Sequence, residues 1–248
     1  MEKTFSLPTT DNKTVYGTLN GRDGHKRAII ILHGLTGKRQ DYLLQRAAHI
    51  IPDHGYDLIR ISLYDGPADA RALHESTLRT HVDDLTATIN YFKERYDTLF
   101  AAGHSYGGTT LISALHPDIT ALSLWDPAIC PRDVWQARLK GMTQYNEMLD
   151  GDYLGSTRLN IRFGRAMVEE GLKMDRRWTI KQAAICPCPV QVIDAGNGPF
   201  VGQGLQFHQL VKVQKTDHTI IKEADHNFFP EGTAERLSQR TIEWFDKF

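Results

Sequence analysis

The sequence predicts an α/β protein in which helices cover both faces of a mostly parallel sheet. Short apolar runs alternate about six times with stretches of helical periodicity, a pattern typical of this class. The run Ala-Ile-Ile-Ile-Leu at 28–32 is apolar at every position, as expected for a central strand buried on both faces. The chain has 248 residues and no internal repeat, so one large domain is expected.

The other elements follow from turn residues and apolar spacing. Besides 28–32, strands are predicted at 4–7, 14–19, 56–63, 98–102, 119–125, 190–193 and 219–221. The first two surround a polar turn and predict an antiparallel edge hairpin. Apolar residues at helical spacing predict helices over 41–54, 75–96, 109–115, 204–213 and 233–248. Pro52 and Gly55 end the first of these helices.

The sequence Gly-His-Ser-Tyr-Gly-Gly at 103–108 indicates a sharp turn between a strand and a helix. In a Gly-x-Ser-x-Gly turn the serine sits at a strained tip, and Gly103 and Gly107 must lack a Cβ so that the backbones can pass. The apolar run before the turn and the helical stretch after it provide that setting. Ser105 is therefore predicted to project its hydroxyl from the sheet and to act as a nucleophile.

Candidate partners of Ser105 follow other strands, because catalytic groups collect where parallel strands end. His226 follows the last strand and is the predicted general base, in the chain order nucleophile, acid, histidine. The sequence His-Gly-Leu-Thr-Gly at 33–37 follows the central strand. The backbone N–H groups of Leu35 in this loop and of Tyr106 after the serine are predicted to bind the oxyanion of a tetrahedral intermediate.

These motifs resemble those of the α/β-hydrolase superfamily over nearly the whole chain. Together with Ala-Asp-His-Asn-Phe at 224–228, they look most like small bacterial carboxylesterases of the cinnamoyl and feruloyl esterase type. The resemblance implies the α/β-hydrolase fold, ester hydrolysis through an acyl-enzyme without metal or organic cofactor, and a small inserted cap. Residues 128–185, where the alternation lapses, are expected to form the cap, and 1–127 with 186–248 the core.

The carboxylate that should orient His226 departs from the family pattern. Its usual place falls on Gly198, and a glycine cannot orient an imidazole. Asp126 and Asp194, each at the end of a predicted strand, are the two candidates. Asp126 is favoured because a strand-end residue followed by a proline is expected to be exposed at the catalytic edge, whereas Asp194 is expected to sit too low in its strand. Some haloalkane dehalogenases and the pancreatic lipases resemble this arrangement, with the acid on the earlier strand.

Composition gives no sign of a nucleic-acid or membrane partner. The chain is 41% hydrophobic and 24% charged, with a formal net charge of -1, so it offers no field that attracts either. No apolar run approaches the length of a membrane span and the start lacks the features of a signal peptide, so a cytoplasmic location is expected. Cys130, Cys186 and Cys188 are interpreted as reduced thiols rather than metal ligands.

The leading hypothesis is a serine carboxylesterase that acts on a small-molecule ester. Ser105 would be the nucleophile, His226 the general base and then acid, and Asp126 the residue that orients the imidazole. Cleavage of thioesters, lactones or amides and acyl transfer use the same chemistry and stay open. A hydrolase-fold protein that binds a small ligand without turnover is the alternative from a different class, and its motive is the missing carboxylate at Gly198.

Overall fold

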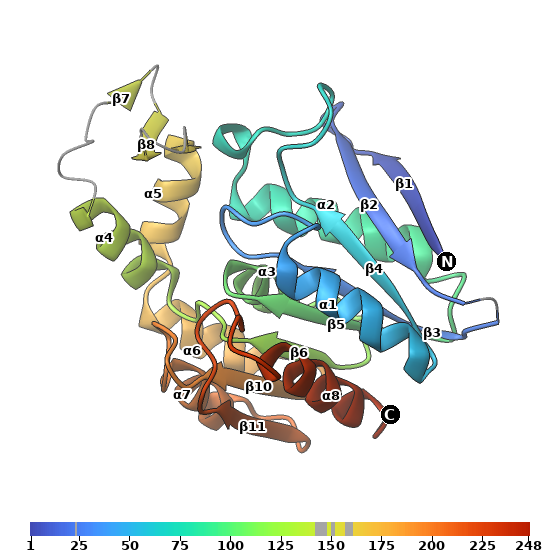
Figure 1. Cartoon of the computed structure of the whole chain (residues 1–248). Helices are drawn as coiled ribbons and strands as arrows, with labels where there is room; N and C mark the ends of the chain where they lie inside the picture. Colours follow the sequence, from blue (N-terminus) through green and yellow to red (C-terminus); the bar gives the residue numbers. More distant parts are fainter. Residues whose placement is uncertain (23, 142–147, 150–151, 157–160) are drawn as a thin grey trace.

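The computed structural model describes residues 1–22, 24–141, 148–149, 152–156 and 161–248. Within these ranges the main sheet has eight strands in the order β1-β2-β4-β3-β5-β6-β10-β11 (Figure 1). The strands are Glu2–Pro8 (β1), Thr14–Asn20 (β2), Arg27–Leu32 (β3), Tyr56–Ser62 (β4), Thr98–His104 (β5), Leu122–Trp125 (β6), Val190–Ala195 (β10) and Thr216–Ile221 (β11). Strand β2 pairs antiparallel with β1 and β4, and the remaining neighbours are parallel. The predicted α/β class and edge hairpin are confirmed.

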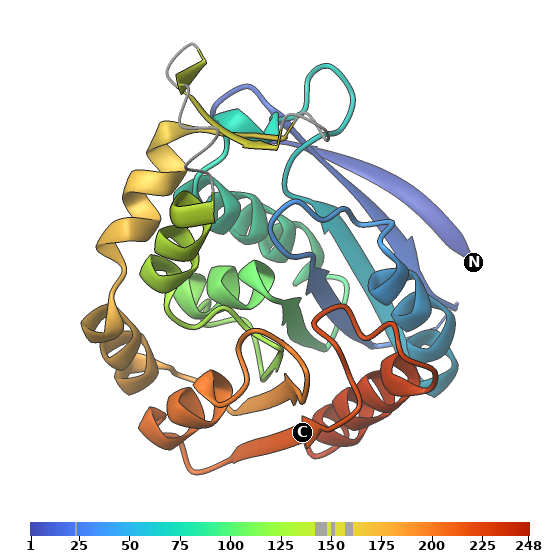
Figure 2. The same ribbon diagram turned by 60° about the vertical axis from the view of Figure 1, so that its left-hand side comes forward.

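Helices cover both faces of this sheet. Their bounds are Tyr42–Ile50 (α1), Leu78–Phe92 (α2), Tyr106–Ala114 (α3), Arg176–Ile185 (α6), Gln203–Leu210 (α7) and Thr233–Phe245 (α8), with 3₁₀ turns at Ile51–His54 and Leu73–Glu75. Helices α1 and α8 lie side by side on one face (Figure 2). Helices α2, α3, α6 and α7 pack on the other.

Strand β3 shows why its sequence has no polar alternation. Ile29 and Ile31 belong to the core beneath α1 and α8, whereas Ile30 and Leu32 belong to the core on the opposite face. All of these side chains are fully buried. A strand with helices on both sides must be apolar on both sides.

Between β6 and β10 the chain leaves the main sheet; residues 128–185 are called the insert below. The insert contains α4 (Pro131–Gly141), a small sheet of β7 (Met148–Leu149), β8 (Asp152–Ser156) and β9 (Ile161–Phe163), and α5 (Arg165–Lys173). Helix α4 packs on α5, and α6 then returns the chain to α3 and α7. Trp135 and Phe163 are fully buried, with their rings 5.1 Å apart edge to face. Both rings belong to the same core cluster as side chains of β3, α2 and α3, so the insert packs directly on this face of the sheet.

Several boundaries differ from those predicted. Helix α3 begins at Tyr106 rather than at 109, because the chain turns directly from Ser105 into the helix. Helix α2 begins after Thr77, whose hydroxyl accepts the Thr80 N–H at 3.0 Å and so caps the helix. Strand β11 begins at Thr216 rather than at 219, since an edge strand tolerates polar residues while its backbone pairs with β10. No helix in the described ranges is long and apolar enough to cross a membrane.

Candidate active site

Ser105 occupies the turn between β5 and α3 in a backbone conformation that few residues other than glycine adopt. Its φ is +54° and its ψ -117°, and strain of this kind persists only where the surroundings impose it. A Cβ on Gly103 would lie 2.6 Å from the carbonyl carbon of Gly107, and a Cβ on Gly107 would lie 2.6 Å from the Leu32 carbonyl oxygen. Glycine is therefore required on both sides of Ser105, as the motif predicts.

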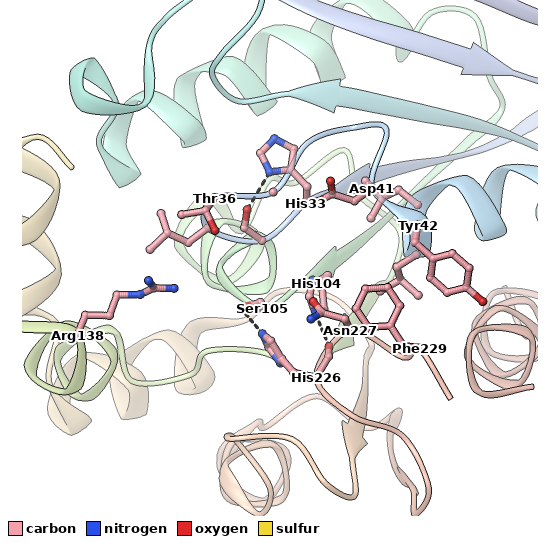
Figure 3. Close-up of a pocket in the computed structure, with 15 residues that line it drawn as sticks. His33, Thr36, Asp41, Tyr42, His104, Ser105, Arg138, His226, Asn227 and Phe229 are labelled. Carbon is pink, nitrogen blue, oxygen red and sulfur yellow. Dashed lines mark hydrogen bonds between the residues drawn. The ribbon is translucent and has the colours of Figure 1, made fainter. Parts of the chain in front are cut away.

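His226 brings its imidazole to Ser105 from the loop after β11. Its Nε2 lies 3.1 Å from Ser105 Oγ (Figure 3), and its Nδ1 lies 2.5 Å from Asp126 Oδ2. A carboxylate at Nδ1 keeps the proton on that nitrogen, which leaves Nε2 free to accept the serine proton. The neighbouring Asp225 does not take this place, because its Oδ1 accepts the N–H groups of the two loop residues Asn227 and Phe229.

Asp126 follows β6 in a left-handed backbone conformation, with φ +37°. The expectation that Asp126 is exposed is wrong: its side chain is fully buried, and its Oδ1 accepts the Ala195 N–H at 3.1 Å. A Cβ on Gly198 would lie only 2.4 Å from Asp126 Oδ2. The Asp126 carboxylate thus fills the space into which a side chain at 198 would project. Glycine at 198 leaves room for the carboxylate that comes from the neighbouring strand.

Asp194, the other candidate acid, is also fully buried but contacts a different histidine. Its Oδ2 lies 3.0 Å from His218 Nε2, and a Cβ on Gly204 of α7 would lie 2.0 Å from its Oδ1. The expectation that Asp194 sits too low is wrong. Ile193 pairs with Trp125, so Asp194 and Asp126 follow at the same level on adjacent strands. The two carboxylates therefore differ in the direction in which their side chains point and not in their height at the sheet edge.

The loop after β3 holds the peptide between Gly34 and Leu35 in one orientation. The Gly34 carbonyl oxygen accepts hydrogen bonds from His33 Nδ1 and from the Tyr64 hydroxyl, each at 2.9 Å. Because the C=O and N–H of a trans peptide point in opposite directions, the Leu35 N–H points away from these donors. Within the described part of the chain, the N–H groups of Leu35 and Tyr106 have no acceptor. Both stay available to an anion.

Two buried histidines hold the loops of the site in place. His33 Nε2 accepts the Leu63 N–H at 3.1 Å, so its proton is on Nδ1, which donates to Gly34. His104 Nε2 donates to the His226 carbonyl oxygen at 2.7 Å. Burial lowers the pKa of His33, and it lowers the pKa of His104 to about 3. Both rings are therefore neutral near pH 7 and serve as fixed hydrogen-bond partners of the two loops.

Ser105 and His226 open into a cavity of about 430 Å³, a size that suits a small organic ligand. Its wall also includes the 33–37 loop, the start of α1 at Asp41 and Tyr42, the residues Asn227 and Phe229 after the histidine, and Arg138 from α4 (Figure 3). Arg138, Tyr42 and Phe229 were not among the sequence candidates. No motif marks them, because only folding decides which residues of a loop or an irregular insert face a site.

No protein-family model and no curated protein matches this sequence. Solved structures are similar to it. Est1E from Butyrivibrio proteoclasticus has 15% identity and a TM-score of 0.76, covering 98% of this chain and 99% of its own. The α/β hydrolase GrgF from Penicillium has 17% identity and a TM-score of 0.78, with 100% and 98% covered. The esterase domain of a Rhodothermus marinus protein has 15% identity and a TM-score of 0.73, with 100% and 98% covered. The likeness extends along the whole chain while identity is low, and it shows that this chain has the α/β-hydrolase fold.

Proposed function

We propose that this protein is a serine hydrolase that cleaves carboxylic esters through an acyl-enzyme intermediate. The proposal rests on the hydrogen-bonded chain from Ser105 Oγ through His226 to Asp126 at the wall of the cavity. A serine hydroxyl is a poor nucleophile until a base within hydrogen-bond reach takes its proton. The imidazole of His226 is within that reach, and a buried carboxylate orients it.

The proposed reaction begins when His226 Nε2 takes the hydroxyl proton and Ser105 Oγ bonds to the ester carbonyl carbon. The carbonyl oxygen becomes negatively charged, and the N–H groups of Leu35 and Tyr106 would bind it. Asp126 stabilises the imidazolium at Nδ1. The imidazolium then protonates the leaving alkoxide, so the alcohol departs and the acyl group stays on the serine. Water, deprotonated by the same imidazole, next attacks the acyl carbonyl, releases the carboxylic acid and restores the free serine.

Two further points support this function over the alternatives. The hypothesis of a ligand-binding protein without turnover was based on the missing carboxylate at Gly198. The contact between Asp126 and His226 removes that reason. Arg138 of α4 lines the same cavity as Ser105, which supports a cap over the substrate in this part of 128–185, whereas α6 at the end of the range packs on α3 and α7. Thioesterase, lactonase and acyltransferase activities would use the same groups, and a substrate panel distinguishes them.

A fluorophosphonate probe and a p-nitrophenyl acetate assay test the proposal. We expect the wild type to be labelled and active, and Ser105→Ala to be unlabelled with turnover reduced at least about 10⁴-fold. The variant Ser6→Ala is the matched control, because Ser6 is exposed on β1 away from the cavity. Labelling that persists in Ser105→Ala would place the nucleophile elsewhere. An unlabelled wild type that hydrolyses no ester in the panel would favour the ligand-binding alternative.

A further inference from the structure

Arg138 contributes the single Lys or Arg side chain among the described residues that line the cavity. It projects from α4 of the insert towards the space above Ser105 and His226 (Figure 3). The other charged group in the wall is Asp41, whose Oδ2 accepts the Lys38 N–H at 2.8 Å. Figure 3 shows Asp41 and Arg138 on opposite sides of Ser105. The end of the cavity towards α4 is therefore the positive end.

The guanidinium of Arg138 has no carboxylate partner among the described residues. Arg132 on the same helix does have one, since its Nη1 lies 3.4 Å from Asp175 Oδ2. Arg138 contacts an aromatic ring: its guanidinium carbon lies 5.5 Å from the centre of the Phe163 ring, which is within reach of a cation–π attraction. The fully buried Phe163 ring thus supports the side chain without occupying its N–H donors.

Arg138 is also partly removed from water. Burial lowers the pKa of its guanidinium, although an arginine keeps its charge in a protein. A cation in such a place gains from an anionic partner, because removal of water makes each remaining electrostatic contact stronger. Within the described chain nothing supplies this partner, and the open side of the guanidinium faces the cavity that holds the reactive serine.

We propose that Arg138 determines specificity by binding a carboxylate carried by the ester substrate. This inference rests on the proposed function and names its substrate class: a monoester of a dicarboxylic acid, or an ester formed by the hydroxyl group of a hydroxy acid. The guanidinium fork matches a carboxylate with two parallel hydrogen bonds. One cation suits a singly charged carboxylate better than a doubly charged phosphate. The free carboxylate would lie towards α4 while the ester carbonyl lies at Ser105.

Two pairs of esters test this inference and distinguish the two sides of the substrate. Methyl hydrogen glutarate against dimethyl glutarate places the charge in the acyl part, and acetoxyacetate against methyl acetoxyacetate places it in the alcohol part. We expect the wild type to favour the anionic member of one pair in kcat/KM. In Arg138→Gln that preference should fall about 10- to 100-fold, the effect of one charged hydrogen-bonded pair, while kcat/KM for the neutral ester changes less than about threefold. The preference of Arg138→Lys for the anionic ester should lie between those of the wild type and Arg138→Gln.

Arg177→Gln is the matched control, because Arg177 is exposed on α6 and its replacement removes the same charge outside the cavity. It should leave the preference unchanged, and thermal melting should confirm that all variants are folded. The inference is overturned if the wild type prefers neither anionic ester, if Arg138→Gln slows both members of a pair alike, or if Arg177→Gln acts as strongly.

If the proposed serine esterase function is wrong, the result differs from a failure of the Arg138 inference alone. In that case no ester is hydrolysed and Ser105 is not labelled. Calorimetry with glutarate then still tests the anion site: binding to the wild type that is at least tenfold weaker in Arg138→Gln supports it, and equal or undetectable binding overturns it.

Discussion

Gly198→Ala should lower the proposed esterase activity although residue 198 bears no functional group. The added Cβ would stand 2.4 Å from Asp126 Oδ2, whereas ordinary van der Waals contact begins near 3.4 Å. One of the two must move by about 1 Å. Asp126 Oδ2 is 2.5 Å from His226 Nδ1, and the same displacement along that line would stretch the contact to about 3.5 Å, outside hydrogen-bond range. Loss of the orienting acid costs about 10⁴ in turnover, and a 1 Å misplacement about 10², so a fall between these limits is expected.

A double-mutant cycle separates this mechanism from general damage to the loop. In an Asp126→Ala background the oxygen that collides with the new Cβ is absent, so Gly198→Ala should then cost less than about threefold in kcat/KM. The assay is p-nitrophenyl acetate hydrolysis by four proteins: the wild type, the two single variants and the double variant. Equal losses from Gly198→Ala in both backgrounds would refute the reasoning, because the effect would not pass through the carboxylate.

The same geometry predicts a rescue. Gly198→Asp combined with Asp126→Ala places a carboxylate on residue 198 and directs its Cβ into the space that the Asp126 side chain vacates. Turnover should rise about 10- to 100-fold above that of Asp126→Ala alone, short of the wild type because the acid is not preorganised. Gly198→Ala in the same background is the matched control, since it adds the Cβ without the charge.

Three further outcomes are expected. Asp126→Asn should lower turnover about 10⁴-fold, whereas Asp194→Asn should stay within about tenfold of the wild type because Asp194 contacts His218 instead. Gly107→Ala should lower the free energy of unfolding in urea by more than about 3 kcal/mol, since its Cβ would stand 2.6 Å from a backbone oxygen that cannot yield easily. His81 is buried, and burial lowers its pKa from 6.5 to about 3, so between these values the unfolded state binds the extra proton and the folded state loses stability as the pH falls. The free energy of unfolding of His81→Leu should therefore rise by about 3 kcal/mol relative to that of the wild type between pH 7 and pH 4. His54→Leu is the control, because His54 is exposed, and it should show no such rise. Urea unfolding at both pH values measures the difference.

The parts of the fold that depend on local patterns could be predicted from the sequence. An apolar strand buried on both faces leaves a continuous run such as 28–32, and the helical spacing of apolar residues locates the helices that cover it. The turn at Ser105 was also predictable, because the collisions that a Cβ would cause at Gly103 and Gly107 demand glycine at fixed distances from the serine. Geometry that acts over a few residues leaves its trace in the sequence.

The insert could not be predicted in the same way. Arg138 lies on an amphipathic helix beside other charged residues, and nothing in its spacing separates it from Arg132, which pairs with Asp175. In the folded protein Arg138 faces the cavity, whereas Arg132 faces α5 and the start of α6. That choice depends on how Trp135 and Phe163 pack, and such packing is a property of the folded insert rather than of any short stretch.

The orienting acid lies between these two cases. Asp126 and Asp194 follow strands that pair in register, so their height at the sheet edge cannot separate them. Strand β10 continues through Ala195, and its pleat turns Asp194 towards α7. Strand β6 has already ended at Trp125, and the positive φ of Asp126, which aspartate tolerates better than most residues, turns its carboxylate to His226 instead. Gly198 was the sequence signal that an acid from another strand is needed, and its missing side chain leaves the space that the Asp126 carboxylate occupies.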